Sequence, residues 1–300
     1  MRKPPALPST SRTSFDLTLP LRGAGGEPIH FYRTIISHGL AFLPPSSVDE
    51  AKKAFRTVLR IGDRPAAITL TERDKAIHIE ADSKLSAGDR DTIRDAVTRM
   101  FRLDDDLSPF YAMIAEDPLL EWAAAGAGRL LASPTVFEDV IKTICTTNCA
   151  WSATIRMTTA LVELGGGTFP DPKLLAQTSE QWFKDVARMG YRGPYVRGIA
   201  QSVVNGELDL ERLLPRFGMS DDEVQTALQK LPGVGPYAAA HIMQLLGRHR
   251  HLILDSSTRP KYLRLTQKKK AKDSTITRSF RRYGDYAGLA FWLFLTRDWE

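Results

Sequence analysis

Leu231-Pro232-Gly233-Val234-Gly235 separates two stretches of helical periodicity, residues 222–230 and 237–246, and this turn decides the fold of the chain. Glycine has no Cβ, so backbone amides of the turn can approach a phosphate closely, and the dipole of the second helix adds attraction for an anion. An ordinary helical hairpin also uses glycine at a helix end, but two glycines around valine after proline form a narrower pattern. We therefore predict a helix-hairpin-helix that binds the backbone of duplex DNA without reading its sequence.

Positive charge gathers downstream of the hairpin. The net charge is +6, yet residues 256–282 contain ten lysines or arginines and one acid, Asp273. Lys268-Lys269-Lys270-Ala271-Lys272 alone would fit a solvated loop, but six of the basic residues lie outside it. We expect this segment to face a polyanion.

The composition indicates a folded protein without a membrane span. Its 300 residues are 43% hydrophobic, which is typical of globular chains. No stretch approaches the ~20 apolar residues of a membrane helix, and the start of the chain lacks an apolar signal core. We expect a soluble, intracellular monomer, located in the cytoplasm or nucleoid.

Two cysteines, Cys145 and Cys149, stand four residues apart near a predicted helix end. They are too few for a disulfide framework or a four-cysteine metal site, which excludes an iron-sulfur cluster held in that way. No histidine or carboxylate has matching metal-ligand spacing. We expect buried structural thiols, no metal and no cofactor.

The first third of the chain predicts an α+β domain over residues 13–107, after a disordered basic tail over residues 1–12. Strands are expected at 15–19, 55–61, 67–71 and 76–81, separated by polar turns, which favours an antiparallel meander. A helix over 87–101, capped by Ser86, should cover the sheet with Ile93, Val97 and Met100.

The remaining residues, 108–300, predict an all-α domain. Helical periodicity occurs in seven stretches separated by short polar or glycine- and proline-containing breaks, and aromatic residues mark the closing helices over 280–295. The seven stretches are 119–125, 136–145, 152–164, 180–189, 195–204, 222–230 and 237–246.

Asp255 stands twenty residues beyond Gly235, after the apolar run Leu252-Ile253-Leu254 and before a probable helix start at 256–258. The hairpin, the second helix and an apolar segment ending in aspartate resemble the helix-hairpin-helix-GPD superfamily of DNA glycosylases. That resemblance implies a catalytic role for Asp255. A helix N-cap is the alternative role, and the two can coexist.

The resemblance covers most of the chain. Residues 137–148 look like the helix and loop with which 8-oxoguanine DNA glycosylases place an asparagine in the space of the extruded base, and Asn148 matches it. Residues 190–196 are similar to their wedge segment, which gives Tyr191 and Arg192 that role. Ala153 departs from the family, because an arginine that reads the opposite cytosine is expected there.

Aromatic side chains are the candidates for a base pocket. Tyr237 and His241 are four residues apart on one helix face, and the resemblance places that face beside the pocket. Trp292 falls where 3-methyladenine DNA glycosylase II carries a pocket tryptophan. Each could instead be a core residue, His241 above all.

These features together predict a monofunctional DNA glycosylase that flips out damaged purines and excises them from duplex DNA, with alkylated purines preferred because aromatic walls attract cationic bases. A carboxylate beside C1′ would stabilise the positive charge that develops on the sugar. Tyr237 stands where bifunctional members carry a lysine, so no AP lyase activity is expected. An 8-oxoguanine-type glycosylase and a non-catalytic damaged-DNA-binding protein are the alternatives.

Overall fold

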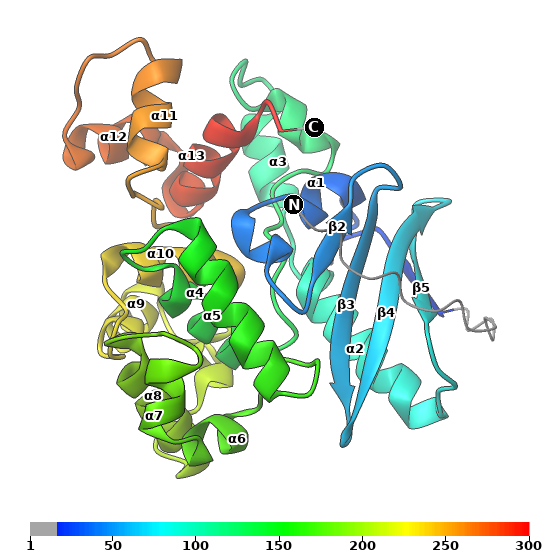
Figure 1. Ribbon diagram of the computed structural model, residues 1–300. Helices are drawn as coiled ribbons and strands as arrows, with labels where there is room; N and C mark the ends of the chain where they lie inside the picture. The colour runs from blue at the N-terminus through cyan, green and yellow to red at the C-terminus, as the bar shows by residue number, and fades with distance from the viewer. Residues whose placement is uncertain (1–16, 300) are drawn as a thin grey trace.

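The computed structural model describes residues 17–299. The tail expected over residues 1–12, and the first two residues of the strand expected at 15–19, lie outside the described residues. Within the described part, the molecule has a sheet layer on one side and helices on the other (Figure 1). No helix of residues 17–299 is both long and apolar enough to cross a membrane.

The sheet has five antiparallel strands in the order β1-β5-β4-β3-β2. Three strands were expected nearly as they stand, β3, β4 and β5, and the described part of the strand expected at 15–19 is β1. The bounds are β1 (Leu17–Pro20), β2 (Ser47–Asp49), β3 (Ala54–Ile61), β4 (Arg64–Arg73) and β5 (Ala76–Ala81). Strand β2 was not predicted, because three residues are too few to show an alternation.

Helix α2 (Ala87–Phe101) covers one face of the sheet (Figure 1). Ser86 caps it as predicted, and a reciprocal bond from Asp89 completes a capping box. Its buried residues Ile93, Val97 and Met100 join the inward-facing residues of the strands in one core. The predicted combination of a sheet domain and a helical region, an α+β fold, is confirmed.

Most of the expected helices are present, but two expectations were wrong. The stretch 119–125 forms a short 3-10 helix, η2, and the helix expected over 180–189 ends at Asp185. The elements outside the sheet, besides α2, are α1 (Phe31–Ile35), η1 (Gly39–Phe42), α3 (Ser108–Ile114), η2 (Glu121–Ala125), α4 (Val136–Thr146), α5 (Trp151–Leu164), α6 (Pro172–Gln177), α7 (Glu180–Asp185), α8 (Arg192–Val204), η3 (Leu210–Leu213), η4 (Pro215–Phe217), α9 (Asp221–Gln229), α10 (Pro236–Leu245), α11 (Thr258–Leu265), α12 (Asp273–Phe280), η5 (Arg281–Tyr286) and α13 (Ala287–Thr296).

The helical region contains two further cores. One is built around α4, α8 and α10, and the other around α3, α12 and α13. Leu40 and Leu43 belong to the second of these cores, although they precede the sheet strands β2 to β5 in the chain. Residues before position 107 therefore pack directly among the closing helices, and the division at 107 and 108 stays a prediction.

Candidate active site and DNA-binding surface

The predicted hairpin joins α9 to α10. Its turn is closed by the amide of Val234, which donates to the carbonyl of Leu231 at 3.1 Å. Gly233 has φ +85, a conformation that costs other residues about 1–2 kcal/mol. The Val234 side chain is 5% exposed and packs into the core around α10. The turn is thus anchored from inside, with its glycines on either side of the anchor.

Gly235 leaves the approach to α10 open. A Cβ at this position would meet nothing within 4 Å. Pro236 is the first helical residue, and the amides at the start of a helix lack partners within it. No described backbone carbonyl accepts from the amide of Gly235. The geometry therefore suits an anion such as a phosphate at this helix start.

Asp255 lies where the chain enters α11. Its Oδ1 accepts from the amides of Ser257 and Thr258 at 2.8 and 2.6 Å, while the Thr258 hydroxyl accepts from the amide of Asp255 at 2.8 Å. No described residue donates a hydrogen bond to Oδ2. The carboxylate therefore caps the helix with one oxygen and offers the other, so the capping and catalytic roles are compatible.

Tyr237 is close to Asp255. Burial raises the pKa of its phenol, a hydrogen bond with Thr146 at the end of α4 opposes this, and the negative charge of Asp255 raises the pKa further. A cavity of about 240 Å³ opens beside Tyr237, and Leu254 and Arg259 also line it. Tyr237 therefore stands between the carboxylate and the end of α4.

His241 continues the line inward along α10. Its ring centroid is 6.1 Å from that of Tyr237 and 5.4 Å from that of His38, which precedes η1. Trp292 does not line the cavity beside Tyr237: its indole packs edge-on against Trp299 and donates to the carbonyl of Ser37 at 2.9 Å. The structure thus brings Tyr237 and His241 together and links Trp292 to them through the segment of Ser37 and His38.

Asn148 is exposed in the loop that follows α4, with φ +47. The loop is held from behind, because the guanidinium of Arg192 donates to the carbonyl of Thr147 and Cys149 Sγ donates to the carbonyl of Cys145 at 3.2 Å. Neither cysteine forms a disulfide. Asn148 is therefore free of core packing and presented on a fixed loop.

Tyr191 and Arg192 have different environments. Tyr191 is 50% exposed, whereas Arg192 is 7% exposed and its guanidinium lies 4.5 Å from the Tyr191 ring centroid. A residue so buried cannot insert between bases without leaving its partners. The structure leaves Tyr191 as the wedge candidate and gives Arg192 the position of a brace between the wedge and the Asn148 loop.

The basic segment forms α11, α12 and the loop between them. Lys268, Lys269 and Lys270 are exposed, and Arg259 makes a bidentate ion pair with Asp273 at 2.7 and 2.8 Å. That pair neutralises the one acid of the segment and fastens α12 to α11. The exposed lysines add positive charge to the loop between α11 and α12, and Asp255 precedes the first of these helices.

Two residues near the site escaped the sequence analysis. His38 lies in a loop far from the motifs, and no periodicity marks it. Trp151 is 43% exposed at the start of α5, just after the Asn148 loop, and a Cβ on Gly39 would lie 3.0 Å from its ring. Its position three residues after Asn148 was the available signal.

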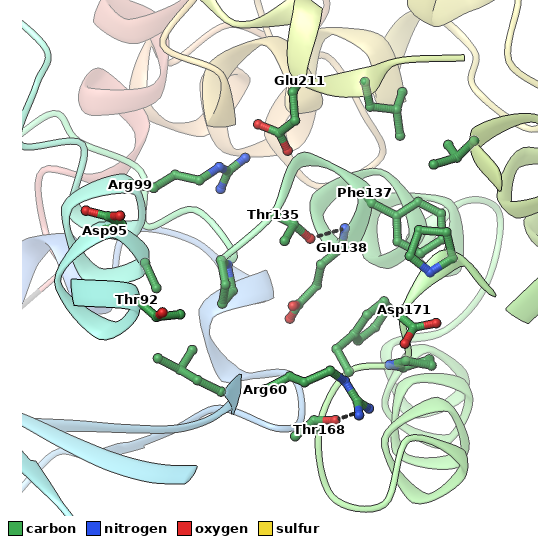
Figure 2. A pocket seen from close by; sticks show the side chains of 18 of the residues that line it. Arg60, Thr92, Asp95, Arg99, Thr135, Phe137, Glu138, Thr168, Asp171 and Glu211 are labelled. Atoms are coloured by element: carbon green, nitrogen blue, oxygen red, sulfur yellow. Dashed lines mark hydrogen bonds between the residues drawn. The ribbon is translucent and has the colours of Figure 1, made fainter. Parts of the chain in front are cut away.

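A large cavity elsewhere is separate from these residues. It measures about 1080 Å³ and lies between β3, α2 and the first turn of α4, and Arg60, Arg99 and Glu138 are among the residues that line it (Figure 2). None of the predicted site residues lines it. From Glu138 to Thr146 helix α4 rises roughly 12 Å, so this cavity and the Asp255 region lie at opposite ends of one helix.

Within the described residues, no group of three or more histidine, cysteine, aspartate or glutamate side chains could hold a metal ion. Cys145 is fully buried, and burial raises the pKa of its thiol to about 12. Such a thiol is a poor nucleophile and a poor ligand.

No family profile matches the sequence. A DNA-3-methyladenine glycosylase of Bacillus subtilis (strain 168) is 26% identical over 166 residues, which is 51% of this chain and 54% of that protein. The chain thus spans about half the length of this curated relative.

Solved structures match over nearly the whole chain. A 3-methyladenine DNA-glycosylase from Archaeoglobus fulgidus has a TM-score of 0.70 at 18% identity, covering 94% of this chain and 99% of that one. An 8-oxoguanine glycosylase/lyase from Clostridium acetobutylicum has a TM-score of 0.71 at 19% identity, covering 95% and 97%. The chain therefore shares its fold with solved 3-methyladenine and 8-oxoguanine DNA glycosylases, in agreement with the resemblance that the motifs indicated.

Proposed function

We propose that this protein is a DNA glycosylase that excises damaged purines from duplex DNA. The observation that carries the proposal is the placement of Asp255: one carboxylate oxygen is fixed by the amides of α11, and the other lies unengaged near Tyr237. The hairpin of Gly233 and Gly235 supplies a phosphate site on the adjoining helix. A carboxylate held beside a DNA backbone is what cleavage of an N-glycosidic bond requires.

The residues divide the reaction among them. The hairpin binds a phosphate, and the target nucleotide leaves the stack because its sugar is otherwise shielded. Asn148 enters the vacated space and Tyr191 stacks against the orphaned partner. Asp255 then stabilises positive charge on the sugar while the base departs, and it helps to position the attacking water.

The enzyme is proposed to be monofunctional, because Tyr237 occupies the place where a lysine would attack C1′. A phenol cannot form an imine. Lys261, on the helix behind Asp255, is engaged elsewhere, because its Nζ lies over the Trp299 ring at 5.1 Å. The product is then an intact abasic site.

Alkylated purines are the preferred substrates in this proposal. Tyr237 offers an aromatic face near Asp255, and aromatic faces attract the cationic bases that alkylation produces. The Bacillus subtilis relative is named for the same class of lesion. Duplex DNA carrying a damaged base is the partner, bound by a protein monomer inside the cell, and the lysines of the loop after α11 strengthen that binding in a salt-dependent way.

The test is an incubation with duplexes that each carry one lesion, in parallel with and without borohydride. We expect release of free alkylated purine, strand cleavage only after alkali, and no trapped adduct. Release of 8-oxoguanine alone would replace the proposed substrate, and a trapped adduct would contradict the monofunctional assignment. DNA binding without release of any base would leave a damage-binding protein in place of an enzyme.

A further inference from the structure

Two buried histidines of the candidate site have hydrogen-bonding groups that the fold does not use. His38 is 1% exposed and His241 is 6% exposed, and their rings meet edge to face at an interplanar angle of 85°. They come from distant parts of the chain, the segment before η1 and the middle of α10. Buried polar groups are normally paired, so such a pair calls for an explanation.

The unused groups can be counted. His38 Nε2 lies 2.7 Å from the carbonyl of Leu131, so this nitrogen carries the proton and Nδ1 is left as an acceptor. His38 Nδ1 and both ring nitrogens of His241 have no partner among the described residues. A neutral imidazole has one donor and one acceptor. The pair therefore offers two acceptors and one donor, whichever tautomer His241 adopts.

Both rings are neutral at physiological pH. Burial lowers the pKa of His38 to about 4 and that of His241 to about 3, and the positive charge of a protonated His38 further lowers the pKa of His241. The charged groups nearest His38, Asp139 and Lys142, have opposing and smaller effects. A neutral ring has an acceptor as well as a donor, whereas a protonated ring can only donate.

The position of the pair fits a base reader. Asp255, Tyr237 and His241 follow one another from the surface inward, and His38 lies beyond them. A nucleotide whose C1′ is beside Asp255 would extend its base past the Tyr237 ring toward the two imidazoles. Trp151 rests on Gly39, next to His38, so an exposed side chain covers this end of the site.

We propose that His38 and His241 read the hydrogen-bonding edge of the extruded base and select guanine-derived lesions. The Watson-Crick edge of guanine presents two donors, N1–H and the exocyclic amine, and one acceptor, O6, which complements two acceptors and one donor. Adenine presents one donor and one acceptor there. Because a buried polar site rejects a ligand that leaves it unpaired, the pair discriminates between the edges whether the lesion is alkylated or oxidised.

This inference rests on the proposed glycosylase function, so the experiment separates the two. Single-turnover base release is measured on duplexes carrying 7-methylguanine, 3-methyladenine, 8-oxoguanine or 8-oxoadenine. We expect the wild-type protein to favour a guanine edge over its adenine counterpart at least tenfold in whichever lesion class it accepts. Equal rates or an adenine preference would overturn the inference while leaving the enzyme in place. Release of no base would overturn both.

His38→Phe and His241→Phe test the residues themselves. Phenylalanine keeps a flat ring. His241→Phe leaves no polar atom unpaired, and His38→Phe leaves only the Leu131 carbonyl without its donor, so we expect both variants to fold, with His38→Phe the less stable of the two. The guanine preference should fall to about one, while affinity for a duplex with an abasic-site analogue, which has no base to read, stays unchanged. His38→Asn, which retains a donor and an acceptor, should keep part of the preference.

His78→Phe serves as the matched control, because this histidine lies on β5 in the sheet. It should leave the preference intact. A guanine preference that survives in both His38→Phe and His241→Phe would refute the base-reading role. Loss of the preference in His78→Phe as well would show a general effect of replacing a histidine and would equally refute it.

Discussion

Replacing Gly235 with leucine tests the hairpin without disturbing its anchor. The backbone of Gly235 has φ −86 and ψ −176, which any residue adopts, and a Cβ there meets nothing within 4 Å. The added side chain would cover the start of α10, where amides lack partners. A hydrogen bond to a charged group contributes about 1.5–3 kcal/mol, so loss of one phosphate contact predicts roughly 10- to 150-fold weaker binding.

The assay is fluorescence anisotropy with a labelled duplex across a salt titration, with the melting temperature measured alongside. Leucine is a poorer N-cap than glycine by about 1 kcal/mol, so we expect the melting temperature to fall by only about 2–4 °C. Gly88→Leu is the matched control, because a Cβ there also meets nothing within 4 Å and the site lies on α2. Binding of Gly235→Leu within twofold of wild type at every salt concentration would refute the role of the hairpin.

Three further outcomes follow from the packing. Gly233→Ala should lower stability by about 2 kcal/mol or more, because φ is +85 and its Cβ would lie 2.8 Å from an aromatic ring of α8; urea unfolding measures this. Glu27→Gln should lower the free energy of unfolding by about 3–5 kcal/mol, because it removes the charge partner of a fully buried arginine, Arg129. Thermal unfolding measures this, and Glu80→Gln, which breaks an exposed ion pair, is the control. Burial lowers the pKa of His249 to about 4, so between pH 6.5 and 4 only the unfolded chain takes up a proton at this residue. The contribution of His249 to the free energy of unfolding should therefore be complete above pH 6.5 and fall as the pH drops to 4. In His249→Gln the free energy of unfolding, compared with the value of the same variant at about pH 7.5, should fall less over this range.

The sequence predicted the features that depend on local chemistry. Ser86 capped its helix where expected, because capping depends on a few neighbouring residues. The hairpin could be predicted because glycine and proline act on their own turn. Asp255 was found from its place after an apolar run, and its capping geometry agrees with the helix start predicted behind it.

Features that depend on tertiary contacts could not be predicted. Arg192 resembled a wedge residue in sequence, and only the packing of α8 against the loop after α4 shows that its guanidinium is buried against Thr147. His38 meets His241 only because the segment before η1 packs beside α10, and neither position carries a pattern that signals the other. Strand β2 is stabilised by pairing with β3 rather than by its own sequence.

The central claim is that the charge of Asp255 drives the cleavage of the glycosidic bond. Asp255→Asn tests it most directly, because the asparagine oxygen can still accept from the amides of Ser257 and Thr258 and so keep the cap on α11. In single-turnover assays on a lesion duplex that the wild type processes, we expect at least a hundredfold loss of base release, in line with about 2.7–4 kcal/mol for one electrostatic group at a transition state, with DNA affinity unchanged or tighter. Base release within tenfold of the wild-type rate, from a variant that binds the duplex equally well, would contradict the account.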